Sequence, residues 1–211
     1  LEVRVRMASL PHGAADGPSL LGEPPQPAIR DVELRDLLSR PQVRLAANHA
    51  EVRSLLAGST VLVTGAGGSI GSEICRQVLR FGPARLVLVE RSEVALFSLV
   101  QSLENEPNPA ASALEPVLLD IAHAERTGRL LAEKRPSVVL HAAAFKHLPL
   151  MEDHPTAAIE NNALATATLA DLASEHGVGT FVALSTDKAV YPSSVMGASK
   201  LLAERYLQAS A

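Results

Sequence analysis

The sequence predicts an α/β fold, a doubly wound parallel sheet with helices on both faces. From Thr60 onward, short apolar runs alternate with helical stretches, and a helix follows each run. Because the strands of a parallel sheet are buried on both faces, they read as continuous apolar runs. The composition, 47% hydrophobic with only 3% aromatic residues, is typical of the small aliphatic core between helices and a sheet. Right-handed crossovers between such units give the doubly wound arrangement.

The expected elements follow one another along residues 57–211. The expected strands are 61–64, 86–90, 116–119, 137–141 and 180–185. The helices expected after them are 69–81, 94–104, 125–134, 155–176 and 195–208. Gly82 and Pro83 end the first of these helices, because neither residue continues helical structure well.

Residues 1–56 differ from the rest, and we expect them to hold the end of a preceding domain and a linker with short helices. Residues 1–7 alternate apolar and charged side chains, as a strand does. Glycines and prolines then interrupt residues 11–27 too often for regular structure. Residues 29–40 read as a short amphipathic helix or turn, and residues 49–56 as a second one. Because the chain starts with Leu rather than Met, we expect it to be a piece of a longer protein.

Charge and cysteine content exclude several classes of function. A net charge of −4 argues against a broad nucleic-acid-binding surface. One cysteine, Cys75, excludes an internal disulfide and a Cys-rich metal site, and the histidines form no ligand cluster. We therefore expect no metal and no nucleic acid. No apolar run reaches the roughly 18 residues that a membrane-spanning helix needs.

A glycine-rich turn lies between the first expected strand and its helix. In "VLVTGAGGSIGSEI", Gly65, Gly68 and Gly71 suit a tight turn, a close approach to a pyrophosphate and close packing of helix on strand. The start of the helix, with Ser69 and Ile70, offers unpaired N–H groups to phosphates. This context predicts dinucleotide binding, although the same glycines could serve only the turn.

Acidic residues end the next two expected strands. Glu90 follows Gly71 at the sequence spacing expected of a carboxylate that binds the adenine ribose. This carboxylate favours NAD, because it repels the 2′-phosphate of NADP. Arg91 could instead receive that phosphate, so NADP stays open. Asp120 and Ile121 fit a contact to the adenine edge, and Asp120 fits the N-cap of a helix equally well.

Four segments together resemble one family: "TGAGGSIGSE", "HAAAFKHLPLMEDHP", "ENNALAT" and "STDKAVYPSSVMGASK". They resemble the extended short-chain dehydrogenases/reductases, and within them the bacterial polysaccharide-biosynthesis group of nucleotide-sugar 4,6-dehydratases and epimerases. The resemblance covers about residues 29–208 and includes the "DLLSR" segment. It implies a Rossmann fold with tightly held NAD and a UDP-sugar substrate.

The large members of this group imply more about the parent protein. They carry a membrane-spanning region and an intervening domain, which places the catalytic part at the cytoplasmic face of the bacterial inner membrane. Their sugar nucleotide is held largely by segments that would follow residue 211. We therefore expect a soluble fragment, truncated before its substrate-binding part and inactive alone, whose open sheet edge could promote self-association.

The resemblance also implies the chemistry. Bound NAD⁺ removes hydride from C4 of the sugar, a base removes the C5 proton, an acid assists loss of the C6 hydroxyl, and hydride returns to C6. Thr186 would hydrogen-bond the C4 oxygen, Asp187 would be the acid at C6, and Lys188 the base at C5. Without the family context, two neighbouring charges after a strand would read as a solvated turn.

Met196 departs from the tyrosine that takes the C4 proton in most of the superfamily. The large membrane-linked members often carry methionine here, so it resembles a subgroup feature. Lys200 keeps its place four residues on, where it can hold the nicotinamide ribose. Tyr191 lies five residues earlier and is out of register. Asp187, Lys200 or a water held by Thr186 remain candidates for the C4 proton.

Further site residues come from the segments before this stretch. Ala142, Ala143 and Ala144 would lie along the cofactor, or merely permit close helix packing. Lys146 and His147 would begin a loop that faces the sugar nucleotide. Asn162 matches an asparagine that braces the active-site strand in the superfamily.

Three functions follow as hypotheses: a 4,6-dehydratase, most simply of UDP-N-acetylglucosamine; a C4 or C5 epimerase with the same 4-keto intermediate; and a non-catalytic NAD-binding module.

Overall fold

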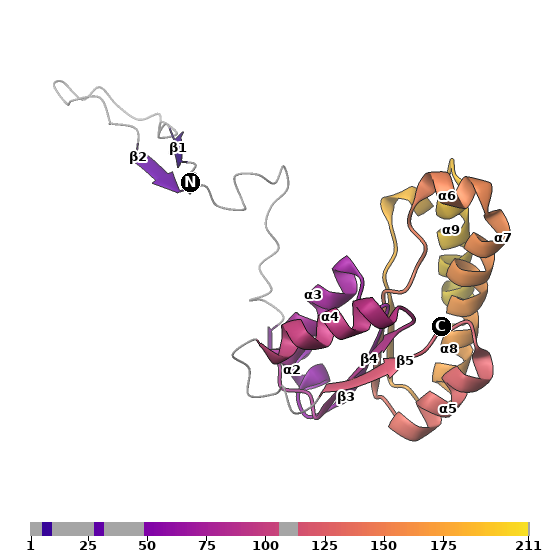
Figure 1. Cartoon of the computed structure of the whole chain (residues 1–211), viewed down its shortest axis with the longest axis horizontal. Helices are drawn as coiled ribbons and strands as arrows, with labels where there is room; N and C mark the ends of the chain where they lie inside the picture. Colours follow the sequence, from indigo (N-terminus) through magenta and orange to yellow (C-terminus); the bar gives the residue numbers. More distant parts are fainter. Residues whose placement is uncertain (1–5, 10–27, 32–48, 106–113, 211) are drawn as a thin grey trace, which may run out of the picture. The chain divides into compact units, whose positions relative to one another are not determined.

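The computed structural model describes residues 6–9, 28–31, 49–105 and 114–210, and the chain divides into two units, Leu1–Asn48 and His49–Ala211 (Figure 1). In the first unit, β1 (Arg6–Ser9) pairs antiparallel with β2 (Ala28–Asp31), with Arg6 opposite Asp31. β1 overlaps the strand expected over residues 1–7 at residues 6 and 7, and residues 1–5 lie outside the described residues. The helix or turn expected from residue 29 is wrong over residues 29–31, because their backbone pairs with β1, a contact distant in sequence. The rest of the expected linker lies outside the described residues.

The second unit is built on one parallel sheet with the strand order β5-β4-β3-β6-β7. This order confirms the doubly wound arrangement, because successive strands are added first on one side of β3 and then on the other. Each expected strand is present, with ends that differ by up to two residues. The strands are β3 (Thr60–Thr64), β4 (Arg85–Glu90), β5 (Leu114–Leu118), β6 (Val138–His141) and β7 (Thr180–Ala183).

Helices pack on both faces of this sheet. Before and between the first strands lie α2 (His49–Leu56), α3 (Ser69–Leu79), α4 (Glu93–Glu104) and α5 (Ala124–Lys134). After β6 follow α6 (Leu148–Asp153), α7 (Pro155–Ala158), the π-helical segment η3 (Ile159–Leu164) and α8 (Ala165–Glu175). After β7 follow the 3₁₀ turn η4 (Asp187–Ala189) and α9 (Val195–Ser210). None of the described helices is long and apolar enough to cross a membrane.

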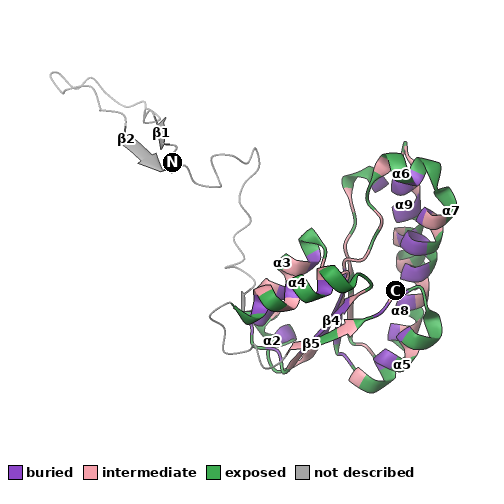
Figure 2. Cartoon of the chain, in the orientation of Figure 1, coloured by how far each residue is buried: buried purple, intermediate pink, exposed green. Residues whose placement is uncertain are grey.

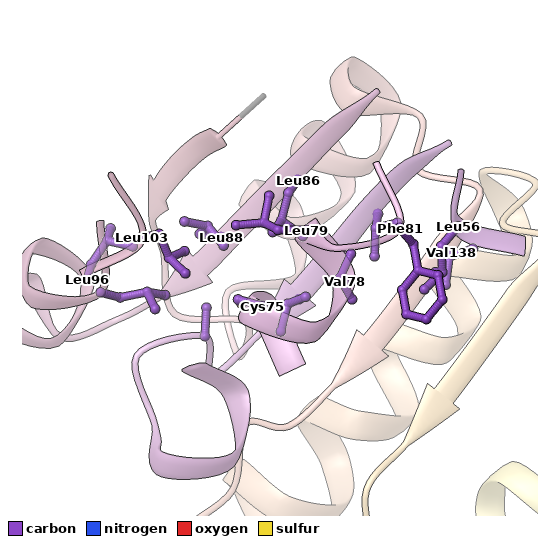
Figure 3. Packing of buried hydrophobic residues seen from close by; sticks show 14 residues of the cluster. Leu56, Cys75, Val78, Leu79, Phe81, Leu86, Leu88, Leu96, Leu103 and Val138 are labelled. Carbon is purple, nitrogen blue, oxygen red and sulfur yellow. The ribbon is translucent and has the colours of Figure 1, made fainter. Parts of the chain in front are cut away.

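Alternate residues of the strands enter two different cores. Val61 and Val63 of β3 pack with α3 and α4, in a cluster that includes Cys75 and Leu103. Leu62, between them, packs on the opposite face with α5 and α8. Figure 3 shows the first cluster, and Figure 2 shows helices that are buried toward the sheet and exposed on their outer side. The two cores explain the continuous apolar strands.

Helix α2 packs with the sheet. Leu56 is buried in the first core and Val52 packs against it, so the helix belongs with the second unit. The sequence places the domain boundary after residue 56, whereas the contacts divide the units after Asn48.

The region between β6 and α8 differs from the expectation of a loop and one long helix. Residues 148–153 form α6, and the helix expected over residues 155–176 is three consecutive segments, α7, η3 and α8. One residue, His154, separates α6 from α7, and Pro155 begins α7, a position that suits proline because the first helical N–H needs no partner within the helix. π-Helical turns inside helices are often found at functional sites.

Candidate functional site

The glycine turn joins β3 to α3 with almost no space for side chains. Gly65 has a φ of +63°, and a Cβ there would lie 2.6 Å from the backbone of Ala143. The N–H of Gly68 donates to the carbonyl oxygen of Gly65 at 3.0 Å. A Cβ on Gly71 would overlap that same carbonyl oxygen. The glycines are therefore needed for a turn, a close approach to β6 and the packing of α3 on β3.

A cavity of about 220 Å³ lies at the carboxyl ends of the central strands. Most residues predicted to bind a cofactor line it, namely Gly65, Gly68, Glu90, Arg91, Asp120, Ile121, Ala142, Ala143 and Ala144. Ser69, Ile70, Gly71 and Lys200 are not among its lining residues. Ala142, Ala143 and Ala144 border this cavity, and Ala143 also lies close to Gly65, so a place along a ligand and close packing both remain open.

Several other residues line this cavity that were not predicted from the sequence, namely Gly67, Val89, Ala95, Leu119 and Asn161. Gly67 stands inside the glycine motif, and a Cβ on it would meet the Ala95 side chain at 2.7 Å, so the motif itself signalled it. Asn161 stands beside the predicted Asn162. No signal in the sequence distinguishes the roles of these two neighbours.

The carboxylate of Glu90 is fixed by backbone amides. One oxygen accepts the N–H of Gly67 at 3.2 Å, and the other accepts those of Arg91 at 2.9 Å and Ser92 at 3.0 Å. The hydroxyl of Ser92 in turn accepts the N–H of Ala95 and caps α4. The Glu90 carboxylate is thus held at the glycine turn with a defined orientation.

The guanidinium of Arg91 is occupied by three partners. Nη1 lies 3.7 Å from Asp120 Oδ2 and donates to Asn161 Oδ1 at 3.2 Å. The guanidinium carbon also lies 4.3 Å from the centre of the Phe145 ring, within the range of a cation–π interaction. The other oxygen of Asp120 accepts the N–H of Ala122, whereas the N-cap of α5 is His123. Asp120 therefore stabilises the turn after β5 and faces the cavity rather than capping the helix.

Asn162 is buried and uses its whole amide group. Its Oδ1 accepts from Phe145 N–H at 2.8 Å and from Asn161 Nδ2 at 2.9 Å. Its Nδ2 donates to Phe145 O at 3.0 Å and to Ser199 Oγ at 3.0 Å. An amide has two acceptor positions and two donors, so all four are satisfied. Asn162 thus ties the segment after β6 to α9. The bracing of the active-site strand that the family resemblance implies for this residue stays a proposal.

His141, at the end of β6, is buried and holds two elements together. Its Nδ1 lies 2.7 Å from Thr64 Oγ1, and its Nε2 lies 2.8 Å from Thr166 Oγ1. Because the Thr166 hydroxyl donates to Asn162 O, it accepts from Nε2–H, and Nδ1 accepts from Thr64. Burial, together with the nearby charge of Lys200, lowers the pKa of His141 to about 3. The ring is therefore neutral, with its proton on Nε2.

The predicted catalytic stretch follows β7 as an exposed turn. The hydroxyl of Thr186 donates to Asp187 Oδ1 at 2.9 Å, and Lys188 Nζ lies 3.4 Å from the same oxygen. The Thr186 hydroxyl, followed by the Lys188 ammonium group, lowers the pKa of Asp187. The structure therefore brings the three side chains together, with Asp187 as a carboxylate, outside the cavity that holds the predicted cofactor residues.

Met196 and Lys200 lie on the buried face of α9. Met196 is 4% exposed and packs with Met151 and Ala158. Lys200 Nζ donates to the carbonyl oxygen of Leu184 at 2.7 Å, and burial lowers the pKa of its ammonium group. Tyr191 precedes α9, is 96% exposed and has a φ of +53°. It therefore does not take the buried helical position that Met196 occupies.

Lys200 also lines a second cavity, of about 480 Å³, between α8, β7 and α9. The expected substrate residues Lys146 and His147 are both exposed just before α6, and His147 is the N-cap residue without a side-chain cap. Within the described residues, no group of three or more His, Cys, Asp or Glu side chains is placed to hold a metal ion.

A parallel sheet of this order, with a glycine turn at its switch point, is a Rossmann fold of the short-chain dehydrogenase/reductase class. Within that class, the chain belongs to the family described as "Polysaccharide biosynthesis protein", whose model matches residues 61–211.

Individual relatives narrow this class. The chain is 45% identical over 180 residues to the capsular polysaccharide biosynthesis protein CapD of Staphylococcus aureus, covering 85% of the chain and 30% of CapD. It is 30% identical over 154 residues to a UDP-N-acetylglucosamine 4,6-dehydratase (inverting) of Campylobacter jejuni strain 81-176, covering 72% of the chain and 44% of that protein. It is 32% identical over 154 residues to a UDP-glucose 4-epimerase of Rickettsia rickettsii, covering 72% and 43%.

A solved structure agrees with this fold. The dTDP-glucose 4,6-dehydratase DesIV of Streptomyces venezuelae, crystallised with NAD and TYD bound, matches with a TM-score of 0.63 and 26% identity, covering 71% of the chain and 51% of DesIV. The chain thus spans between about a third and a half of the length of these proteins.

Proposed function

We propose that the chain is the dinucleotide-binding and catalytic part of a UDP-sugar 4,6-dehydratase that acts on UDP-N-acetylglucosamine. The observation that carries this proposal is the cavity at the switch point, where the glycine turn and the fixed carboxylate of Glu90 meet. The dehydratase of C. jejuni supports the substrate. The epimerase of R. rickettsii, at similar identity, supports the alternative of a UDP-sugar C4 or C5 epimerase.

NAD fits the cavity better than NADP. A 2′-phosphate would meet the carboxylate of Glu90, which backbone amides fix in place. Arg91 could offset this repulsion only by leaving Asp120, Asn161 and the Phe145 ring. The residues present therefore fit an adenine ribose that carries a free 2′-hydroxyl group.

We assign the catalytic roles to three residues of the turn after β7. NAD⁺, held by the residues that line the cavity, would supply the hydride acceptor for oxidation at C4 and the hydride donor for reduction at C6. Thr186 binds the C4 oxygen, Asp187 protonates the departing C6 hydroxyl, and Lys188 removes the C5 proton and returns a proton there.

Thr186 and Asp187 also provide a route for the C4 proton that Met196 cannot accept. As the C4 hydroxyl gives its proton to Thr186 Oγ1, the Thr186 proton passes to Asp187 Oδ1 along their 2.9 Å hydrogen bond. Asp187 then holds the proton that leaves with the C6 hydroxyl as water. Protons balance, because Asp187 begins and ends the cycle as a carboxylate. Lys200 is less suited to this task, since its amino group already donates to Leu184 O.

The test of turnover uses the whole natural protein with UDP-N-acetylglucosamine in D₂O, analysed by mass spectrometry and NMR. Loss of one water with deuterium at C5 supports the dehydratase. An isomer of unchanged composition, apart from exchanged deuterium, supports the epimerase. An unchanged sugar despite bound NAD contradicts both for this substrate, and unaltered biological activity and NAD affinity of Lys188→Gln would then indicate a non-catalytic module.

The proton route has a separate test in single-turnover absorbance at 340 nm, which follows the reduced cofactor. Lys188→Gln blocks elimination after C4 oxidation, so we expect reduced cofactor to accumulate. Asp187→Asn removes the final proton acceptor, so we expect the reduced cofactor to form at least tenfold more slowly. Rapid accumulation in Asp187→Asn would show that Asp187 acts only as the acid at C6. Thr186→Val removes the hydroxyl that passes the proton to Asp187, so reduced cofactor should form more slowly in this variant too. Thr186→Ser keeps the hydroxyl and is its matched control.

A further inference from the structure

Arg91 gathers three segments at the carboxyl edge of the sheet. It follows β4 directly, and its partners come from the end of β5, from the segment after β6 and from η3. These partners are Asp120, Phe145 and Asn161. A planar guanidinium group can make all these contacts together, whereas the single ammonium group of a lysine cannot.

Further hydrogen bonds connect Asn161 to α9, the helix that carries Lys200. Asn161 Nδ2 donates to Asn162 Oδ1 at 2.9 Å, and Asn162 Nδ2 donates to Ser199 Oγ at 3.0 Å. The Ser199 hydroxyl donates to Met196 O at 2.7 Å, so it lies between Met196 and Lys200 on α9. An unbroken set of hydrogen bonds therefore connects the cavity to α9.

This set contains little freedom in its middle. Asn162 is fully buried and has all four hydrogen-bonding positions filled. Its partner Phe145 is held by both its N–H and its C=O, and the ring of the same residue contacts Arg91. Arg91 thus acts on the Asn162 amide from two sides, through Asn161 and through Phe145.

The cavity end of the set is partly open to water. The side chains of Arg91 and Asp120 are 42% and 33% exposed, and both residues line the cavity. A ligand that covers them removes water, and electrostatic contacts strengthen where the local dielectric constant falls. Binding at this end should therefore hold Arg91 more firmly against Asn161 and Phe145.

We propose that Arg91, Asn161 and Ser199 are positioning residues that couple the adenosine end of the dinucleotide site to the catalytic helix α9. The inference rests on the proposed occupation of the cavity by a dinucleotide. Filling the cavity stabilises the position of Met196 and Lys200 through the Asn162 amide. By reciprocity, a change on α9 alters the affinity for the adenosine half of the ligand.

The first test is a double-mutant cycle on ADP-ribose affinity, measured by calorimetry with this chain. Ser199→Ala leaves the Asn162 amide with an unpaired donor and does not touch the cavity, and we expect it to weaken binding about fivefold. Arg91→Lys keeps the positive charge but cannot make the three contacts together. We expect Ser199→Ala to cause no further loss in the Arg91→Lys chain, whereas a full fivefold loss there would overturn the coupling.

Arg85→Lys is the matched control. Arg85 begins the same strand, and its guanidinium makes comparable polar contacts, with Glu115 at 3.9 Å and Lys134 O at 3.1 Å, away from the cavity. We expect the ADP-ribose affinity of this variant to equal that of the unchanged chain.

The second test is hydrogen exchange along α9, which does not depend on the affinity of any variant. ADP-ribose should slow exchange of the amides around Ser199 in the unchanged chain at least threefold, and should not slow it in Arg91→Lys at saturating ligand. Binding without any change in α9 would overturn the inference and leave the dinucleotide site intact. Failure of the unchanged chain to bind ADP-ribose would overturn the dinucleotide site and this inference with it.

Discussion

Replacement of Gly71 by alanine tests the close packing at the glycine turn. The new Cβ would overlap the carbonyl oxygen of Gly65 and lie 3.0 Å from the Cα of Ala66. Both are backbone atoms at the end of β3, so relief requires α3 to move away from the strand. Overpacking of this kind costs about 1–3 kcal/mol, and the gain from replacing a helical glycine returns only about 0.5–1 kcal/mol.

We therefore expect Gly71→Ala to lower the free energy of unfolding by about 1–2 kcal/mol. For a unit of this size, that corresponds to a decrease in Tm of roughly 2–8 °C. Because the turn moves with α3, the affinity for ADP-ribose should fall more than tenfold. Thermal and urea unfolding followed by circular dichroism measure the first effect, and calorimetry measures the second.

Gly128→Ala is the matched control, also within a helix. Its Cβ would lie 3.4 Å from the Leu172 side chain, an ordinary contact distance, and 3.9 Å from His176 Nε2. Only the propensity gain remains there, so this variant should be more stable by about 0.5–1 kcal/mol. If Gly71→Ala gained stability like Gly128→Ala, the inferred packing of α3 against the turn would be refuted.

Three further predictions concern the catalytic turn and two buried groups. Gly197→Ala places a Cβ against the carbonyl oxygen of Lys188. In the whole natural protein, kcat should therefore fall at least tenfold, while the affinity for NAD changes less than threefold. Equal losses in kcat and in NAD affinity would contradict a local effect. His141 has a folded pKa of about 3 against an ordinary value of 6.5, so between these values the unfolded chain binds more protons and stability falls as pH falls. The free energy of unfolding should fall from pH 7 to pH 5, and this fall should be about 2 kcal/mol larger in the unchanged chain than in His141→Gln. Burial raises the pKa of the Cys75 thiol to about 12, so a thiol reagent should label it only as fast as the protein unfolds, and rapid labelling of the native chain would contradict this burial.

Much of the fold could be predicted because its signals are local. The strands are continuous apolar runs, and the glycine turn has a φ value and contacts that few other residues tolerate. The pairing of β2 with β1 could not be predicted, since it depends on residues distant in sequence. The short helix α6 was also missed, because six residues give too little periodicity to distinguish a helix from a loop.

The candidate site was predictable to the same extent. Glu90, Asp120 and Ala142 lie at or just after the carboxyl ends of β4, β5 and β6, and such ends meet at one edge of a parallel sheet, where these residues line one cavity. Asn161 was missed because successive residues of a helix are turned apart by about 100°, so a buried Asn162 does not predict a buried neighbour, yet both asparagines are buried in η3. The partners of Arg91 were likewise invisible, since they come from three separate segments.

The environment of Met196 gives a physical reason for a methionine where most of the superfamily has a tyrosine. The side chain is buried with Met151 and Ala158, an apolar contact that fixes α9 against α6 and α7. A phenol hydroxyl confined within these apolar contacts would need a hydrogen-bond partner, which a methionine does not. We therefore propose that proton transfer is carried by the Thr186–Asp187 pair on the turn after β7. In the proposed enzyme, α9 anchors the site and the turn carries the acid–base chemistry.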